Sequence, residues 1–211
     1  MEGTVELKKA FEELRNEKKR KFVQTVDLIV NLQNYDARKE ALNTFLNVPH
    51  PNEKKICAFL TKRSKILPSI IEDDFSKYKE RKEMKRLAQE YDFFIAVAPM
   101  MGKIATKFGR VFGPLSKMPS PQGGIIGKDD DETVNAMVEK LKKMIRVKNK
   151  EASIKIAVGK EGMSDNELIE NIEELIRQLE KKLPRGKENI KDAYVKFTMT
   201  KPIKFIDYRN K

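Results

Sequence analysis

The sequence predicts a split α+β domain made from the two chain ends, with an inserted α/β domain that has three layers and a Rossmann-like sheet. Two observations predict this class. Strands and helices of similar amphipathic type lie at both chain ends, and strands alternate with helices in between. A Pro-His-Pro-Asn interruption at residues 49–52 marks the first passage between the parts. We therefore expect residues 1–53 and 142–211 to form the split domain and residues 54–141 the inserted domain.

The first chain end predicts a helix, a strand and a second, short helix. Thr4 is the expected cap of the first helix, and the basic residues 18–21 suit its C-terminal end. Residues 22–32 form the expected strand, because apolar residues alternate along it. Its apolar face holds Val26, Leu28, Val30 and Leu32. Asp36 can then cap a short helix that runs through Leu46.

The middle of the chain alternates between the two kinds of element. Apolar strands are expected at residues 56–60 and 93–97, with a basic helix through Lys85 and Leu87 between them. A short helix follows the second strand, with Pro99 in its first turn and Gly109 after its end. Such alternation favours a parallel sheet covered by helices.

The last part of the chain predicts two helices and several strands. Acids at residues 129–132 open a helix whose apolar stripe runs from Val134 to Ile145. Ser164 and Glu167 form a capping box for a long amphipathic helix. The strands are expected at residues 153–158, 190–198 and 203–206.

The chain is strongly basic. It has 44 lysines and arginines against 32 acidic residues, a formal net charge of +12. This balance is expected of a protein whose partner is rich in phosphate, with an anionic membrane surface as the rival partner. No apolar run approaches the roughly 18 residues of a membrane-spanning helix, and the first residues predict a helix rather than a signal peptide. We expect a soluble, cytoplasmic protein with no membrane partner.

The positive charge is distributed unevenly. Residues 1–53 have no net charge, residues 54–141 have +5 and residues 142–211 have +7. Besides the C-terminal excess, residues 93–128 form a basic stretch that contains no acidic residue. A sheet face with basic edges can follow a phosphate backbone, but lysines on strands can also serve only to keep strand edges from aggregating. The lysines on or beside the last two expected strands are Lys191, Lys196, Lys201 and Lys204.

Residues of the kinds that catalyse reactions are few. Cys57 lies in an apolar stretch, which favours a buried hydrophobic role, and His50 is the only histidine available for a zinc cluster or a Ser-His-Asp site. A nucleotide-dependent enzyme built around Lys103 and Lys128 is an alternative, but neither lysine lies in the register of a phosphate-binding loop. We expect no catalytic residue, metal or cofactor. The glycines of this region are expected in turns, with positive φ: Gly109, Gly113, Gly123, Gly124 and Gly127.

Several short motifs are specific enough to suggest a family. Residues 102–103 read Gly-Lys, residues 108–114 read Phe-Gly-Arg-Val-Phe-Gly-Pro and residues 117–121 read Lys-Met-Pro-Ser-Pro. They resemble the Gly-Lys, Leu-Gly-Arg, Leu-Gly-Pro and Met-Pro-Asn-Pro signature of the ribosomal protein L one family. Three further segments of this chain are similar to other motifs of the family. They are Lys-Phe-Val-Gln-Thr-Val-Asp at residues 21–27, Ala-Val-Gly-Lys at residues 157–160 and Thr-Met-Thr-Lys-Pro at residues 198–202. The resemblance covers essentially the whole chain and looks more archaeal or eukaryotic than bacterial.

The resemblance implies that the two chain ends grip the stalk of large-subunit ribosomal RNA, with the central portion hinged on them. It also implies a place near the exit site for transfer RNA on the cytoplasmic ribosome, E-site transfer RNA as a partner, repression of the protein's own messenger RNA, and a monomer off the ribosome. The protein would then recognise the shape of the RNA. Its hydroxyl groups would bond the ribose, its apolar side chains would pack on a sugar or a base, and its lysines would neutralise phosphates. The RNA-binding residues that the resemblance implies are Lys21, Phe22, Gln24, Thr25, Lys160, Thr198, Met199, Thr200 and Lys201.

Two positions depart from the family pattern. Gln24 stands where the family usually has glutamate, and Thr200 stands where it has glycine. Gln24 keeps an acceptor oxygen, whereas Thr200 adds a side chain where close approach of the backbone is expected, so we expect altered RNA affinity rather than lost function. Without the resemblance, Thr198 and Met199 would be read as an ordinary strand end. An RNA-binding protein of the same fold that acts in ribosome assembly is the nearest alternative, and long lysine-rich extensions would favour it.

Overall fold

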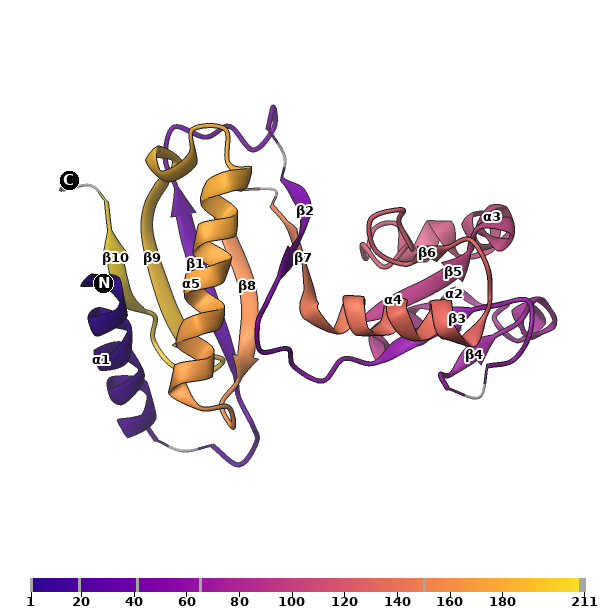
Figure 1. Cartoon of the computed structure of the whole chain (residues 1–211), viewed down its shortest axis with the longest axis horizontal. Helices are drawn as coiled ribbons and strands as arrows, with labels where there is room; N and C mark the ends of the chain where they lie inside the picture. Colours follow the sequence, from indigo (N-terminus) through magenta and orange to yellow (C-terminus); the bar gives the residue numbers. More distant parts are fainter. Residues whose placement is uncertain (1, 19, 41, 65, 150, 209–211) are drawn as a thin grey trace. The chain divides into compact units, whose positions relative to one another are not determined.

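The computed structural model describes residues 2–18, 20–40, 42–64, 66–149 and 151–208. The chain divides into two compact units (Figure 1). Unit 1 combines residues 1–52 with residues 143–211, and unit 2 is the intervening stretch, residues 53–142. The chain therefore leaves unit 1 once and returns to it once.

Unit 1 is built around an antiparallel sheet with the strand order β10-β9-β1-β8, accompanied by a ribbon of β2 and β7. Strand β1, from the first chain end, lies between β8 and β9 from the second, so neither chain end completes this sheet alone (Figure 1). The elements of unit 1 are α1 (Glu2–Asn16), β1 (Thr25–Leu32), β2 (Asn43–Asn47), β7 (Met144–Lys148), β8 (Ser153–Lys160), α5 (Asp165–Lys182), η3 (Gly186–Asn189), β9 (Ile190–Phe197) and β10 (Ile203–Asp207).

One face of this sheet is buried beneath α1 and α5. The alternate residues of β1 that were expected to face the core are buried there, together with Phe11 of α1 and Leu175 of α5. The intervening residues Thr25, Asp27 and Ile29 are only partly buried. Burial of each large apolar side chain contributes about 1.5–3 kcal/mol, so the two helices are held mainly by their apolar faces.

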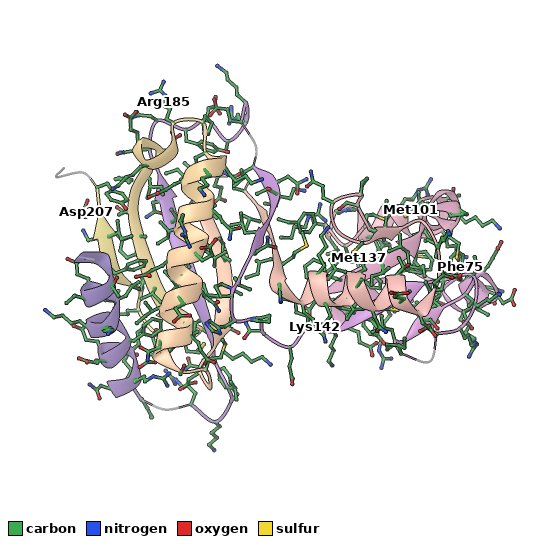
Figure 2. All side chains as sticks on the ribbon, viewed as in Figure 1. Phe75, Met101, Met137, Lys142, Arg185 and Asp207 are labelled. Carbon is green, nitrogen blue, oxygen red and sulfur yellow. The ribbon has the colours of Figure 1, made fainter. Side chains whose placement is uncertain are left out.

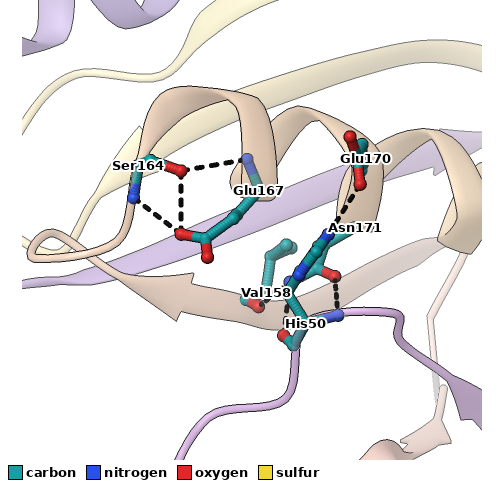
Figure 3. Close-up of polar contacts among 6 residues, drawn as sticks. All are labelled: His50, Val158, Ser164, Glu167, Glu170 and Asn171. Atoms are coloured by element: carbon teal, nitrogen blue, oxygen red, sulfur yellow. Dashed lines mark hydrogen bonds and ion pairs between the residues drawn. The ribbon is translucent and has the colours of Figure 1, made fainter.

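Asn171, in the middle of α5, ties the end of the first chain segment to the helix (Figure 3). Its side-chain oxygen accepts a hydrogen bond from His50 N at 2.9 Å, and its amide nitrogen donates to His50 O at 2.7 Å and to Val158 O at 3.4 Å. The helix begins at the predicted capping box, in which Ser164 and Glu167 each bond the other's backbone N–H. The Asn171 side chain is fully buried, so its polar groups need these partners within the protein.

Unit 2 contains a parallel sheet with the order β4-β3-β5-β6. The prediction of a parallel sheet with covering helices is confirmed, and β5 has the predicted bounds. The elements of unit 2 are β3 (Ile56–Phe59), β4 (Ser69–Ile70), η1 (Glu72–Lys77), α2 (Arg81–Glu90), β5 (Phe93–Val97), η2 (Ala98–Met100), α3 (Met101–Phe112), β6 (Ile125–Ile126) and α4 (Asp131–Lys143, whose last residue belongs to unit 1).

Aromatic side chains fill the core of unit 2 between the sheet and helices α2 and α3. Phe59, Phe94, Phe108 and Phe112 are buried, and the centroids of contacting rings among them lie 4.7–6.2 Å apart. Phe75, labelled in Figure 2, packs edge-on against two of these rings. Such tilted and edge-on contacts add about 0.5–1.5 kcal/mol each to the free energy of burial.

The expected helix from Asp36 through Leu46 is wrong. The Asp36 carboxylate accepts a hydrogen bond from Arg38 N, and Glu40 N donates to Asp36 O, so Asp36 organises a local turn. The chain then enters β2, where Asn43–Asn47 pairs antiparallel with β7. Pairing with a strand about 100 residues away therefore overrides the local helical pattern.

Five further predictions need correction. Gly109 lies inside α3, which continues to Phe112, because buried Phe108 and Val111 keep the helix on the core. Ile145 belongs to β7, since α4 ends at Lys143. Of the five glycines expected with positive φ, only Gly124 has it. The strand expected from residue 22 begins at Thr25, and the strand expected to reach Thr198 ends at Phe197.

Candidate nucleic-acid interface

Three segments of unit 1 meet at one end of the antiparallel sheet. They are residues 21–25 before and at the start of β1, residues 160–163 at the end of β8, and residues 198–201 in the turn between β9 and β10. The register of the sheet brings them together, since Thr25 pairs with Lys160 and Val26 pairs with Phe197. We call this region the Gln24 surface.

Gln24 connects the other two segments. Its backbone oxygen accepts a hydrogen bond from Glu161 N at 2.8 Å, and its backbone N–H donates to the Glu161 carboxylate at 3.2 Å. Its side-chain oxygen accepts from Met199 N at 3.1 Å. The side chain is only 2% exposed, so Gln24 acts as an internal brace rather than as a direct contact.

Thr198 joins β9 to the start of β1. Its hydroxyl oxygen accepts a hydrogen bond from Thr25 N at 3.0 Å, and the hydroxyl donates to Thr25 O at 3.3 Å. A hydroxyl has one donor and two acceptor sites, so Thr198 keeps one acceptor site for a bound group such as a ribose 2′-OH. The residue is exposed, which leaves that site within reach of a partner.

Thr200 closes the turn in which Met199 lies. Thr200 N donates to Phe197 O at 3.1 Å, and the Thr200 hydroxyl oxygen lies 2.9 Å from Phe197 N, from which it accepts. The side chain that replaces the usual glycine of the family therefore stabilises the turn from within. Met199, at the tip, is left pointing away from the core with 56% of its surface exposed.

Apolar side chains are unusually exposed beside this turn. Phe22 is 53% exposed and Val23 is 66% exposed, although large apolar side chains normally avoid water. With Met199 they provide surfaces on which a sugar or a base can pack. The sequence motif identified Phe22 and Met199, whereas Val23 was not among the predicted site residues.

The Gln24 surface contains three lysines, one in each of its segments. Lys21, Lys160 and Lys201 are all exposed, and Lys160 lies opposite Thr25 in the sheet. On the partly exposed sheet face, Lys196 pairs in register with Asp27. Burial raises the pKa of the Asp27 carboxyl, and the positive charge of Lys196 opposes this shift. The lysines provide the positive potential that phosphate groups require.

The structure thus brings together most of the residues that the family motifs indicated. Gln24, Thr25, Lys160, Thr198 and Met199 are linked by backbone pairing or by hydrogen bonds. Thr200 supports them through the turn, whereas Lys21, Phe22 and Lys201 belong to the surface by chain position and exposure. The sequence did not predict Glu161 as a site residue, because an acidic residue carries no signal of RNA binding in a single sequence.

The described residues offer little for catalysis. Burial raises the pKa of the Cys57 thiol to about 12, so the nucleophilic thiolate is suppressed at neutral pH. No group of three or more histidine, cysteine or acidic residues that could hold a metal occurs in the described ranges. Lys103, a candidate phosphate ligand, is held by the Glu72 carboxylate at 2.5 and 2.6 Å. Within the same ranges, no helix is long and apolar enough to span a membrane.

Comparison with known proteins identifies the family. The model of the ribosomal protein L1p/L10e family matches residues 14–201. The large ribosomal subunit protein uL1 of Pyrobaculum calidifontis is 33% identical over 210 residues, covering 94% of this chain and 91% of that protein. The protein of the same name from Thermococcus kodakarensis is 35% identical over 199 residues, covering 89% and 90% respectively. The chain described here therefore belongs to the ribosomal protein L1p/L10e family, whose members are structural proteins rather than enzymes.

Proposed function

We propose that this protein is a structural component of the large ribosomal subunit in the cytoplasm, and that it binds the stalk region of large-subunit ribosomal RNA through the Gln24 surface. The observation that carries the proposal is the brace from Gln24 to Met199, which holds two chain-end segments in one exposed, lysine-rimmed surface. Relatives named as large ribosomal subunit proteins support the ribosomal role.

The arrangement suits recognition of RNA shape. Met199, Phe22 and Val23 offer apolar contact, the Thr198 hydroxyl offers an acceptor for a ribose 2′-OH, and the lysines neutralise phosphates. None of these groups forms a bidentate pattern of the kind that reads a base edge. We therefore propose that a compact RNA fold, rather than a linear sequence, is the ligand of the split unit formed by the two chain ends.

We add three finer roles to the proposal, each of which the family resemblance implies. The protein lies near the exit site and contacts E-site transfer RNA, it represses its own messenger RNA where that RNA folds like the stalk, and it is a monomer off the ribosome. A ribosome-assembly protein of the same fold is the alternative, and it would be expected in pre-ribosomal particles but not in mature subunits.

The proposal is tested by comparing the affinity of the intact chain for a stalk-region ribosomal RNA fragment and for an RNA duplex of equal length. We expect strong preference for the stalk fragment that persists as salt rises from about 50 to 200 mM, because shape-specific contacts are less sensitive to salt than phosphate contacts. Equal affinity for both RNAs, lost steeply with salt, would contradict the proposal. Sedimentation with mature large subunits separates the ribosomal role from the assembly role.

A further inference from the structure

Arg15, in the last turn of α1, binds the turn that follows β8. Its Nε donates to the Asp165 carboxylate at 2.7 Å, and its terminal nitrogens donate to Glu161 O at 3.2 Å and to Met163 O at 2.9 Å. The planar guanidinium directs these bonds in a fixed fork, so a single side chain holds the turn at two backbone carbonyls and at the start of α5. No motif in the sequence marks Arg15 for this role.

The same turn determines the position of Gln24. Both backbone polar groups of Gln24 are bonded to Glu161, one to its N–H and the other to its carboxylate. The side chain of Gln24 in turn accepts the N–H of Met199. A displacement of Glu161 would therefore move Gln24 and, through it, the tip of the turn between β9 and β10.

We infer that Arg15 is a positioning residue for RNA binding, which acts by holding residues 161–163 so that Glu161 fixes Gln24 and Met199. This inference rests on the proposed RNA-binding function. Arg15 lies on α1, outside the three segments of the Gln24 surface, and its side chain keeps 38% exposure while bonded to Asp165. Each of its three side-chain nitrogens has an acceptor within the protein, so we assign its effect on RNA affinity to geometry more than to charge.

Two substitutions separate geometry from charge. Arg15→Gln removes the charge and the fork, whereas Arg15→Lys keeps the charge but replaces the planar fork by a compact ammonium, whose three donors sit on one nitrogen. Arg177→Gln is the matched control, because Arg177 is an exposed arginine of α5 that pairs with Glu174 and has no described bond to residues 161–163. RNA affinity is measured for the wild type, the two Arg15 variants and the Arg177→Gln control. The temperature is kept well below that of unfolding, as checked by circular dichroism.

We expect both Arg15 variants to bind the stalk fragment about five- to tenfold more weakly than the Arg177→Gln control, with unchanged affinity for the duplex. Because a lost phosphate contact reduces the slope of log affinity against log salt, the Arg15→Lys variant is expected to keep the wild-type slope. Amide hydrogen exchange at Gln24, whose N–H donates to Glu161, is expected to be faster in both variants.

Three outcomes would overturn the inference. If Arg15→Lys restores full affinity while Arg15→Gln loses both affinity and salt slope, Arg15 contacts phosphate directly. If both variants match the control in affinity and in exchange at Gln24, the turn does not need Arg15. If the wild-type chain shows no preference for the stalk fragment, the proposed function itself fails, and the inference falls with it.

Discussion

The side-chain oxygen of Gln24 accepts a hydrogen bond from the backbone N–H of Met199 at 3.1 Å, across 175 residues of sequence. This bond joins the residue before β1 to the turn between β9 and β10. It keeps an exposed methionine in a fixed turn while the bracing glutamine remains buried. Rigid support beneath exposed contact groups is what a shape-reading surface needs, since ordering on binding would otherwise reduce affinity.

Gln24→Met is predicted to weaken binding of stalk RNA more than it weakens the fold. The methionine keeps the apolar volume but removes the acceptor for Met199 N–H, at a cost of about 1 kcal/mol to folding. Affinity for the stalk fragment is expected to fall by about tenfold or more, measured by titration. Gln33→Met is the control at the other end of β1, because it also loses a side-chain hydrogen bond, to Glu188 O. An equal loss of affinity in both variants would contradict the prediction.

Asn171→Leu is predicted to destabilise unit 1 by about 2–3 kcal/mol. The leucine has a similar shape but leaves His50 N and His50 O, which are partly buried, without their side-chain partner. The measurement is urea denaturation followed by circular dichroism. Asn166→Leu, at an exposed position of the same helix, is expected to change the midpoint little. Similar midpoints for the two variants would show that the clamp on His50 is not needed.

Gly124→Ala is predicted to destabilise unit 2 strongly. Gly124 has φ +125°, and a Cβ there would lie 2.5 Å from the backbone oxygen of Phe94. The backbone strain alone costs about 1–3 kcal/mol, before any cost of moving β5. Gly127→Ala is the control, because a Cβ at Gly127 meets no atom within 4 Å. Thermal unfolding and amide exchange at Ala96, whose N–H donates to Gly124 O, would report the difference.

Lys54 is predicted to make stability depend on pH in the alkaline range. Burial lowers the pKa of its ammonium from 10.5 to about 8, with Asp92 opposing the shift, while Nζ donates to the carbonyl oxygens of Leu141 and Lys142. Between about pH 8 and 10.5 the unfolded chain binds more protons at this lysine than the folded chain does. The free energy of unfolding that this lysine contributes therefore rises with pH in that window.

The measurement is urea denaturation of the wild type and of Lys54→Met at pH 7.5, 8.5 and 9.5. The unfolding free energy of the wild type minus that of the variant is expected to increase with pH, by less than about 1.4 kcal/mol per pH unit. Lys55→Met, which removes an exposed positive charge next to Lys54, is the control for general charge effects. A difference that stays flat or decreases between pH 7.5 and 9.5 would contradict the assignment.

The local sequence pattern was sufficient to predict an element where that element is long or wholly apolar. The run Phe93–Val97 becomes β5 with the predicted bounds, and the Ser164 capping box opens α5 as expected. The local pattern was insufficient to predict β2 and β7, because each strand is short and gains its hydrogen bonds from the other. Asn43, for example, pairs with Lys148. Pairing over such a separation leaves no trace in a window of neighbouring residues.

The candidate site was predictable only through family motifs. Periodicity treats Thr198 and Met199 as a strand end, and nothing local distinguishes Gln24 from any other polar residue before a strand. Their roles come from contacts over more than 170 residues, which the sheet creates when it places β1 between β8 and β9. Arg15 and Glu161 carry no motif signal, so only the three-dimensional arrangement reveals them.

The most direct test of the central claim is RNA binding by Thr198→Val with Met199→Ala, compared with the wild type on the stalk fragment and on the duplex. The valine removes the hydroxyl that bridges to Thr25, and the alanine removes the exposed apolar contact. We predict that the double variant keeps its duplex affinity and salt dependence but loses most of its preference for stalk RNA. Full preference in the double variant would place the RNA site elsewhere on the protein and contradict the account.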